Sequence, residues 1–574
     1  MRLKTLLLAG LASLASASPA AAQYLEESHD HAHGQQQAQP TPPARPAAPI
    51  APPPAQLADT TWQTELGFEP EVFRAHVAFL ADDMLEGRDA GSRGHELAAH
   101  YVATQMQALG VTPGNNGSWY QRVPFTRSKG SSGRLTVGGR SFTVGQDLVF
   151  LPGIAEQPLA MDAQAVFGGQ GVIDAASGRD DLAGLDLAGK ILVIMAAQGV
   201  NPQAGIMAAA SRGAIGAVVI RPAEAAATAP LSRAAGGVGA TRLVEEPAAA
   251  GAAGPMGALR FIAMADMPVL EAMFANAPRP LAQVAADLQA KRPVRGFAFA
   301  PAMRLERTVE PDRFTSPNVV AIIPGSDPAL RNEYVLLSAH LDHVGIRGEA
   351  TGQRNIAGAE DDRIFNGAMD NATGIATLLE VARKFMEPGN RPKRSILIAA
   401  VTAEEDGLLG SKYLARNPVV PGKIVANVNL DMPILTYAFK DVVAFGAEHS
   451  SLGPIVERAA KTMNVALIPD PLPQERLFTR SDHYSFVQAG IPAVFLMTGF
   501  GGEGEQRFKS FLANEYHSPK DDMNLPIDWK TGARFAELNY RIAREIANAA
   551  QAPRWYQGSE FAPKDAQTVP APKK

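Results

Sequence analysis

The stretch YVLLSAHLDH, residues 334–343, is a β-like apolar run that ends on two histidines and an aspartate. Two further apolar runs end in acidic residues: the run over 396–402 leads to Glu404 and Glu405, and the run over 424–430 leads to Asp431. In open α/β sheets, ligands bind at the carboxyl ends of the strands. The three runs therefore predict an α/β fold in which one sheet edge collects acidic and imidazole side chains.

The bulk composition limits the classes of protein that this chain can be. Its 574 residues are 46% hydrophobic and 19% charged, which is enough for more than one buried core. The net charge is −5 and no long Lys/Arg patch occurs, so we expect no nucleic-acid partner. The absence of cysteine excludes a disulfide framework and a lipid-modified N-terminal cysteine. No apolar run has the roughly 20 residues that a membrane-spanning helix needs.

The start of the chain has the pattern of a secretory signal peptide over residues 1–22. Arg2 and Lys4 precede a short apolar run, and Ala22 ends a small-residue cleavage site. We expect cleavage near Ala22 and a secreted or periplasmic protein, with a retained N-terminal anchor as the alternative. Residues 23–58, rich in proline and alanine, are expected to form a disordered tether.

Two of the strand ends carry groups that suit a two-metal hydrolytic site. His340 ends its run, and Asp342 points the same way if the strand persists. The carboxylate of Asp342 would then accept the other ring N–H of His340 and fix the orientation of the ring. Asp431 closes a buried run, where a carboxylate is costly unless it is paired or binds a metal.

Further acidic and imidazole residues extend this pattern. Asp370 lies just before a helix expected over 372–385, where a plain N-cap is the alternative interpretation. Glu404 and Glu405 are adjacent, so their side chains point in different directions, and one can bind metal while the other carries protons. Two close carboxylates also push one pKa upward, toward the range of a general base. His517 would supply a missing nitrogen ligand.

In chain order, His-x-Asp, Asp-Asn-x-x-Gly, Glu-Glu, Asn-Leu-Asp and His-Ser-x-x-Asp resemble the motifs of the co-catalytic zinc aminopeptidases. That family also contains glutamate carboxypeptidases and, more distantly, glutaminyl cyclases. The resemblance covers most of residues 59–554 and implies a mixed central β-sheet flanked by helices. It implies two Zn²⁺ ions per chain, with these ligands: His340 and Asp431 on one ion, Glu405 and His517 on the other, and Asp370 bridging both.

The same resemblance assigns roles to the residues around the ions. It implies that Glu404 is the general acid/base and that Asp342 supports His340. It also implies a cis peptide bond between Asp370 and Asn371.

A stretch near residue 480 also resembles the substrate side of that family's cleft. It makes Arg480, Asp482 and His483 candidate substrate-binding residues, although Asp482 can instead cap the helix that follows. His343 is a further pocket candidate. Phe478 stands near the place where some relatives carry a tyrosine, so no oxyanion donor is identified.

The sequence changes character between residues 146 and 292, where alanine and glycine become dense and no acidic or imidazole cluster occurs. This stretch resembles the protease-associated domain, a small β-rich module inserted in secreted peptidases; an ordinary accessory α/β insert is the alternative. We therefore predict a peptidase domain in two parts, 59–145 and 293–554, interrupted by the insert over 146–292. Residues 555–574 are expected to form a flexible tail.

The ligand set predicts a secreted zinc metallopeptidase, in first place an aminopeptidase that removes N-terminal residues from peptides through a metal-bridging water and Glu404. A glutamate-type carboxypeptidase would need a basic pocket, for which Arg480 is the obvious candidate. A glutaminyl cyclase would use a single zinc ion. A receptor-like scaffold without catalysis is the fourth possibility, and the complete ligand set argues against it. The sequence leaves open whether the protein is a monomer or a homo-oligomer.

Overall fold

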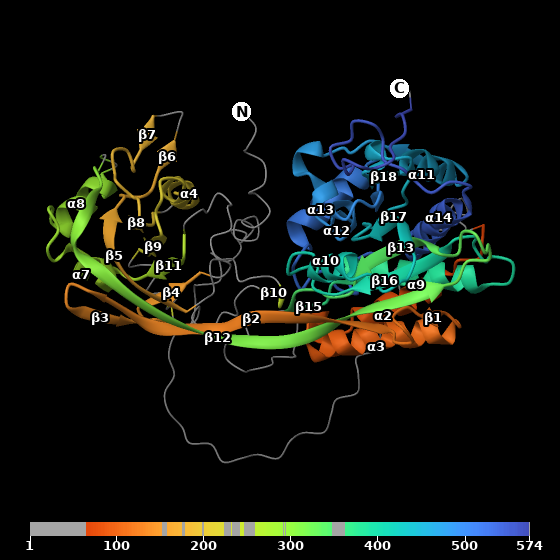
Figure 1. The fold of residues 1–574 in the computed structure, drawn as a ribbon, viewed down its shortest axis with the longest axis horizontal. Helices are drawn as coiled ribbons and strands as arrows, with labels where there is room; N and C mark the ends of the chain where they lie inside the picture. The colour runs from red at the N-terminus through yellow and green to blue at the C-terminus, as the bar shows by residue number, and fades with distance from the viewer. Residues whose placement is uncertain are drawn as a thin grey trace, which may run out of the picture. The chain divides into compact units, whose positions relative to one another are not determined.

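The computed structural model describes residues 65–151, 158–174, 178–197, 200–222, 231, 241–245, 259–290, 292, 294–346 and 362–572. The chain divides into two compact units (Figure 1). Of the described residues, the main unit comprises those within Asp59–Arg127, Thr241–Glu246 and Asp312–Lys574, and the insert unit comprises those within Ser128–Ala240 and Pro247–Pro311. The predicted signal peptide (1–22) and tether (23–58) lie outside the described residues.

The main unit is organised around β13 (Glu333–His340), which runs parallel to β16 (Ser395–Val401) on one side and to β17 (Lys423–Leu430) on the other. The outer strands are β20 (Ala493–Thr498), β18 (Asp441–Phe445) and β19 (Ala466–Ile468) beyond β17, and β12 (Phe297–Ile323) beyond β16. Because β12 pairs antiparallel with β16, and β18 antiparallel with β20, the sheet is mixed, as predicted.

Side chains of β13 alternate between two helical layers, as the two-residue period of a strand requires. Val335, Leu337 and Ala339 belong to the core on one face, whereas Tyr334 and Leu336 belong to the core on the other. Burial on both faces explains why this strand reads as a continuous apolar run. The three predicted strands are thus confirmed, with ends within a residue or two of the expected positions.

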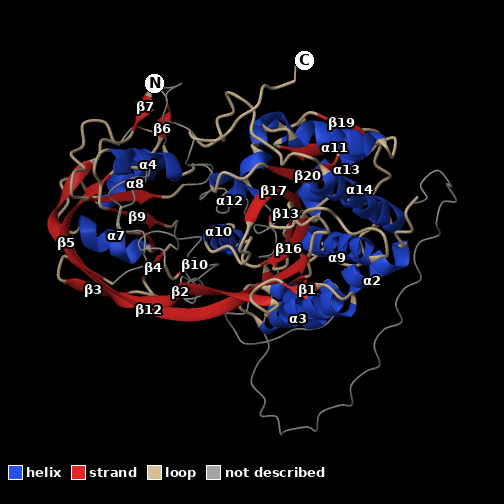
Figure 2. Cartoon of the chain, turned by 45° about the vertical axis from the view of Figure 1, so that its right-hand side comes forward, coloured by secondary structure: helices blue, strands red, loops and turns tan. Residues whose placement is uncertain are grey.

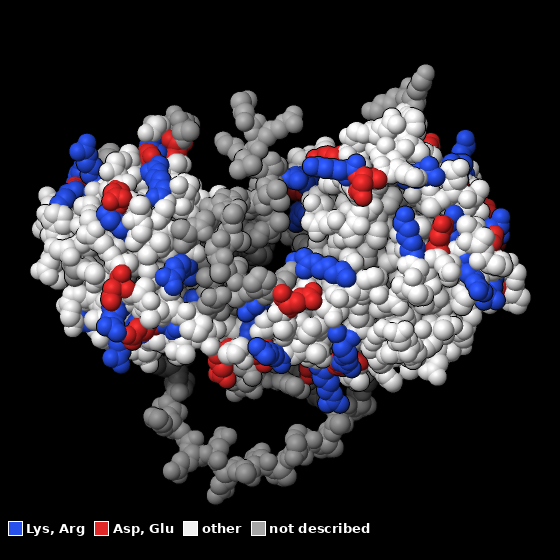
Figure 3. Space-filling view, viewed as in Figure 1, with Lys and Arg blue, Asp and Glu red and all other residues white. Residues whose placement is uncertain are grey.

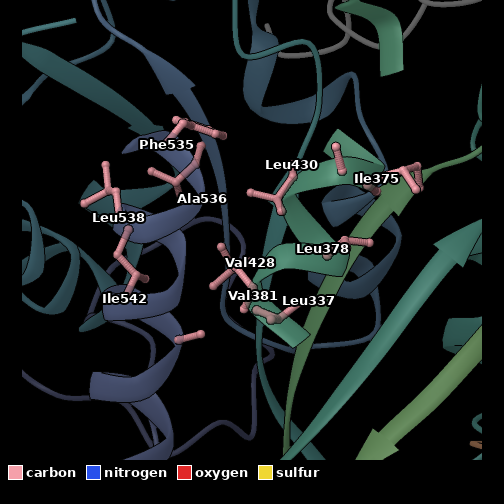
Figure 4. Close-up of a cluster of buried hydrophobic side chains, with 14 of the residues drawn as sticks. Leu337, Ile375, Leu378, Val381, Val428, Leu430, Phe535, Ala536, Leu538 and Ile542 are labelled. Atoms are coloured by element: carbon pink, nitrogen blue, oxygen red, sulfur yellow. The ribbon is translucent and has the colours of Figure 1, made fainter. Parts of the chain in front are cut away.

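Helices cover both faces of this sheet (Figure 2). The helices of the main unit are α2 (Pro70–Leu80), α3 (Arg93–Ala108), α9 (Thr373–Met386), α10 (Leu409–Arg416), α11 (Leu452–Lys461), α12 (His483–Gln488), α13 (Gly504–Asn514) and α14 (Trp529–Asn548). Residues of α9 and α14 pack on the first face of β13 (Figure 4), and residues of α10 and α12 pack on the second. The helix expected over 372–385 is confirmed as α9. Short strands complete the unit: β1 (Thr112–Pro113), β10 (Arg242–Leu243), β14 (Gly345–Ile346) and β15 (Ile364–Phe365).

The insert unit has its own sheet, in the order β12-β5-β8-β9-β11-β4, and two cores of its own. Its strands are β2 (Tyr120–Val137), β3 (Arg140–Thr143), β4 (Leu148–Phe150), β5 (Leu159–Phe167), β6 (Ile173–Asp174), β7 (Arg179–Asp180), β8 (Ile191–Met195), β9 (Gly216–Ile220) and β11 (Ile262–Ala265). Its helices are α4 (Gln203–Ser211), α7 (Met267–Phe274) and α8 (Leu281–Gln289).

The insert unit begins before residue 146 and ends after residue 292, the boundaries expected from composition. Both boundaries fall inside single long strands, since β2 passes Ser128 and β12 passes Pro311 without a break. A strand that continues across a boundary has no change of composition there, so the sequence does not mark it. That this unit is a protease-associated domain stays a prediction.

The segment 555–572 is packed in part, which corrects the flexible tail predicted over 555–574, of which residues 573 and 574 lie outside the described residues. Trp555 is buried and donates a hydrogen bond from Nε1 to the carbonyl of Gly490 at 2.9 Å. The ring of Phe561 lies 4.9 Å from that of Phe478. Proline content suggested a tail, but the aromatic residues between the prolines anchor the segment.

Two surface properties complete the description. Among the described residues, no helix is both long and apolar enough to cross a membrane. On the face of the molecule in Figure 3, Lys and Arg side chains lie interspersed with Asp and Glu side chains.

Candidate metal centre

Three parallel strands bring the acidic and imidazole residues to one edge of the sheet. His340 is the last residue of β13, Glu404 and Glu405 follow the end of β16, and Asp431 follows the end of β17. The register of β13 on β16 pairs His340 with Val401, so the two strands end at the same level. Residues that are far apart in the sequence are therefore neighbours at this edge.

The potential ligand atoms form two groups, each with its atoms within 4.8 Å of one another. The first group is His340, Asp370 and Asp431; the second is His343, Asp370, Glu405 and His517. The structure thus brings together all five residues that the family resemblance implied as ligands, and it divides them between two groups that share Asp370. It adds His343 to the second group.

Asp370 has the position of a bridge between the two groups. Its Oδ1 lies 3.1 Å from Nε2 of His340, and its Oδ2 lies 3.4 Å from Nε2 of His517. Nε2 of His340 is also 3.1 Å from Oδ1 of Asp431, and Nε2 of His517 is 2.9 Å from Oε2 of Glu405. Each histidine therefore faces one oxygen of the shared carboxylate and one oxygen of its own carboxylate.

The backbone around Asp370 is held by a residue that sequence reasoning did not single out. The Asp521 carboxylate accepts hydrogen bonds from the main-chain N–H groups of Met369 (2.7 Å) and Asp370 (3.0 Å). The only sequence signal was its place as the last residue of the His-Ser-x-x-Asp motif. The peptide bond between Asp370 and Asn371 is cis, as the resemblance implied.

The structure also decides between the two interpretations of Asp370. Oδ1 of Asn371 accepts a hydrogen bond from the N–H of Gly374 at 3.1 Å, so Asn371 satisfies a free N–H at the start of α9. The carboxylate of Asp370 instead faces the histidines. A Cβ on Gly374 would lie 2.2 Å from Oδ1 of Asn371, which explains the glycine of the Asp-Asn-x-x-Gly motif.

Asp342 does not use its carboxylate as the sequence suggested. Nδ1 of His340 donates to the main-chain carbonyl of Asp342 at 3.1 Å, rather than to its side chain. The two carboxylate oxygens accept the main-chain N–H groups of Glu404 (3.2 Å) and Glu405 (3.3 Å). The prediction assumed that the strand persists to Asp342, but β13 ends at His340, and the alternation of side chains ends with it.

The environment moves the pKa values of the two adjacent glutamates in opposite directions. Desolvation raises the pKa of Glu404 well above its ordinary value, against the charge of His340 and with help from the charge of Asp431. Desolvation and Asp370 also act to raise the pKa of Glu405, but the imidazoles of His343 and His517 outweigh them and lower it to about 2. Glu405 is therefore held as a carboxylate, while Glu404 is suited to exchange protons.

A chain of hydrogen bonds through the sheet holds Asp431. Asn427 donates to Ser338 (2.9 Å), Ser338 donates to Asn429 (2.7 Å), Asn429 donates to Ser481 (2.8 Å), and Ser481 donates to Oδ2 of Asp431 (2.6 Å). All five residues are buried. The alternation of Asn427, Asn429 and Asp431 along an otherwise apolar strand is the signal that could have revealed this chain.

The predicted substrate-binding residues lie in different surroundings. Arg480 is about half exposed and 4.0 Å from Glu475. Asp482 and His483 are fully buried, and neither belongs to a ligand group. Nε2 of His483 donates to the carbonyl of Phe478 at 2.7 Å, and burial lowers the pKa of His483 to about 3. The alternative role of Asp482 as a helix cap is not observed, because its side chain makes no capping hydrogen bond to α12.

Arg88, a fully buried cation, lies close to these carboxylates. It donates to four main-chain carbonyls: Leu80, Leu341 (2.8 Å), Asn366 (2.5 Å) and Gly367 (3.0 Å). Its charge partly offsets those of Asp521, Asp342, Asp370 and Glu405. Buried carboxylates are costly unless they are paired or bind metal, and imidazole nitrogens with carboxylate oxygens are the ligands that zinc takes in hydrolytic sites. The residues present therefore fit a pair of zinc ions.

Residues 318–543 match the family model of peptidase family M28. We name residues 318–543 the M28 region after this match. The M28 region resembles leupeptin-inactivating enzyme 1 of Streptomyces exfoliatus, with 30% identity over 227 residues that cover 36% of this chain and 44% of that protein. It also resembles a probable glutamate carboxypeptidase of Arabidopsis thaliana, with 30% identity over 175 residues, 27% of this chain and 24% of that protein. The chain thus spans less than half the length of these relatives.

Solved structures resemble the chain more distantly. An aminopeptidase from Aneurinibacillus sp. strain AM-1 has a TM-score of 0.48 at 18% identity, covering 88% of this chain and 98% of that one. A zinc aminopeptidase from Bacillus subtilis also has a TM-score of 0.48 at 18% identity, covering 85% of this chain and 97% of that one.

Proposed function

We propose that the M28 region is a di-zinc peptidase that removes N-terminal residues from peptides. The observation that carries the proposal is the pair of ligand groups that share Asp370, with Glu404 on the loop that also supplies Glu405. His340 and Asp431 would hold one ion, and Glu405 and His517 the other. A zinc pair bound in this way polarises a carbonyl and lowers the pKa of water.

The chain's own residues supply the proton transfers of the reaction. Glu404 takes the proton from the attacking water and delivers it to the leaving amine, a role that its raised pKa supports. Asp342 holds the main-chain N–H groups of Glu404 and Glu405, so the base and the ligand beside it are placed together. Asp521 does the same for the bridging residue Asp370.

The charge of the site favours a free α-amino group over a carboxylate as the substrate end that binds. The carboxylates around the two ligand groups attract an ammonium group and repel an anion. Arg88 is fully buried and its donors reach main-chain carbonyls, so it cannot bind a substrate carboxylate. A glutamate-type carboxypeptidase and a glutaminyl cyclase use related sites, but the three activities differ in the substrates that they turn over.

The test uses the purified full chain with a panel of substrates: N-terminal amino-acid anilides, N-blocked peptides ending in glutamate, and peptides with N-terminal glutamine. We expect hydrolysis of the anilides, loss of activity with a chelator, and two zinc ions per chain by elemental analysis. Turnover of the blocked peptides alone would favour the carboxypeptidase. One zinc ion with cyclisation of N-terminal glutamine would favour the cyclase, and zinc-free protein without turnover would favour a scaffold.

Glu404→Gln is the decisive variant for the mechanism. It should keep both zinc ions and reduce kcat by roughly 10²–10⁴-fold, the range that positioned acid–base groups contribute. Glu71→Gln, on the outer side of α2 with its side chain 68% exposed, is the matched control and should leave kcat unchanged. Unchanged turnover in Glu404→Gln would defeat the assignment of the base.

We further propose that the protein is exported and cleaved near Ala22. The support is the positive start, the short apolar run and the small residues that end at Ala22. Mass spectrometry of the mature N-terminus in fractionated cells tests this, and an intact N-terminus in the cytoplasmic fraction would contradict it.

A further inference from the structure

The second ligand group has one member more than the first, and the extra residue is His343, to which the family resemblance gave no place among the ligands. The His343 side chain is fully buried, and its Nδ1 donates to Oε1 of Glu405 at 2.6 Å. The other oxygen of Glu405, Oε2, lies 2.9 Å from Nε2 of His517. Oε2 of Glu405 therefore faces the other members of its ligand group, while Oε1 accepts the hydrogen bond from His343.

Asp431 in the first group is divided in the same way. Its Oδ1 lies 3.1 Å from Nε2 of His340, and its Oδ2 accepts the hydroxyl of Ser481 at 2.6 Å. Each terminal carboxylate thus offers one oxygen to its group, and a buried donor holds the other. His343 and Ser481 are unrelated in chemistry and in chain position, but they take equivalent places.

This division determines how many protein atoms each ion meets. Hydrolytic zinc sites keep an open coordination position, whereas sites with four protein ligands are closed and structural. With Oε1 engaged by His343, the second group offers three atoms: one oxygen of Asp370, one oxygen of Glu405 and Nε2 of His517. A carboxylate that bound through both oxygens would take the position that water or substrate needs.

The distance between His343 and Glu405 favours a hydrogen bond over a second bond to the same ion. Two ligands about 2.0–2.1 Å from one tetrahedral zinc lie about 3.3 Å apart. The observed 2.6 Å is well below this, and it is also shorter than the 2.9–3.4 Å between the other imidazole and carboxylate atoms of the two groups, as a strong hydrogen bond requires.

The ring of His343 is confined on several sides. A Cβ on Gly367 would lie 2.7 Å from Cγ and Cδ2 of the ring, so the glycine leaves the space in which the ring packs. The ring of His517 meets it edge-on, with 5.6 Å between centroids. The main-chain N–H of His343 donates to the carbonyl of Arg88 at 3.4 Å. The donor is therefore held in place before an ion binds.

Resting on the proposed di-zinc function, we propose that His343 is a positioning residue that restricts Glu405 to binding through a single oxygen. It thereby keeps one coordination position of the second zinc ion open.

The test measures metal binding as well as activity, on the full chain. His343→Ala removes the donor, and His343→Asn keeps one, because the amide nitrogen of asparagine occupies nearly the place of Nδ1. His100→Ala, an exposed histidine of α3, is the matched control. The readouts are zinc content, the affinity of each ion by competition with a chelator, the visible absorption of the Co²⁺-substituted protein, and kcat and KM.

We expect both the wild type and His100→Ala to bind two zinc ions, and the affinity for each ion should be the same in the two proteins. In His343→Ala the second ion should bind about 10–100-fold more weakly, the usual effect of removing a partner of a ligand. Its Co²⁺ absorption should also lose intensity as the coordination number rises, and kcat should fall while KM changes little. His343→Asn should restore most of the affinity and of the absorption. If His343→Ala does not fold, His343→Leu removes the donor at nearly constant volume.

Three results would overturn the inference. A folded donor-free variant that keeps the wild-type affinity and Co²⁺ spectrum would show that the hydrogen bond has no effect on the ion. Loss of one imidazole from the zinc X-ray absorption spectrum of His343→Asn would make His343 a ligand. A wild type with fewer than two zinc ions would defeat the proposed function, and this inference with it. In the first two cases the di-zinc hydrolase stands.

Discussion

Replacing Asp342 by asparagine tests whether the loop that carries Glu404 and Glu405 is placed by a single carboxylate. The two oxygens of Asp342 accept one main-chain N–H each, at 3.2 and 3.3 Å. Asparagine has nearly the same shape but offers only one oxygen. Its NH₂ group would face an N–H group, so one hydrogen bond is lost and two donors are brought together.

The expected size of the effect follows from these contacts. A hydrogen bond to a charged group stabilises by about 1.5–3 kcal/mol, and the lower value suits the long distances observed. Leaving the second N–H without an acceptor costs about 1 kcal/mol more. The total of about 2.5 kcal/mol corresponds to roughly 70-fold in kcat if the loop must regain its place in the transition state.

The assay is the hydrolysis of an N-terminal anilide, with zinc content measured on the same preparation. Asp528→Asn is a matched control, since the Asp528 carboxylate also accepts two main-chain N–H groups, those of Lys530 and Thr531, at the start of α14. The control should keep its kcat and lose little stability, because both N–H groups bond to the same oxygen, Oδ1, which asparagine retains. A folded Asp342→Asn protein with two zinc ions and a kcat within twofold of the wild type would refute this reasoning.

Two further predictions concern the buried cation and proton release. Arg88→Met should lower the free energy of unfolding by about 3–5 kcal/mol, because four buried carbonyls lose their donor. Denaturant titration of the zinc-loaded protein measures this free energy, and a loss under 1 kcal/mol would contradict the prediction. Desolvation acts to lower the pKa of His517, but the carboxylates of Glu405 and Asp370 outweigh it and raise the pKa to about 10 in protein stripped of metal. His517 is then protonated at pH 7 and must lose its proton to bind zinc, so zinc affinity should fall as the pH falls below about 10. Calorimetry in two buffers with different ionisation enthalpies should show this proton release, and identical heats in both buffers would count against it.

The sequence predicted the part of the molecule in which local pattern and chemistry agree. Apolar runs of strand length that end in acidic or imidazole residues became β13, β16 and β17, and their parallel pairing brings the ends together. The sequence did not predict where side chains point once a strand has ended. The carboxylate of Asp342 and the ring of His343 lie after β13 has ended, where the two-residue period no longer states where a side chain points.

The turn before Glu404 shows why such directions are not written in the local sequence. Ala403 is buried and has φ +55°, a conformation that residues other than glycine, asparagine and aspartate seldom adopt and that costs about 1–2 kcal/mol. An alanine gives no signal for it. The turn persists because other contacts offset its cost: Leu409 donates to the carbonyl of Ala403 at 2.9 Å, and Asp342 accepts the two N–H groups that follow. The placement of Glu404 and Glu405 therefore depends on Asp342, which lies 62 and 63 positions earlier, and only the folded chain brings the two parts together.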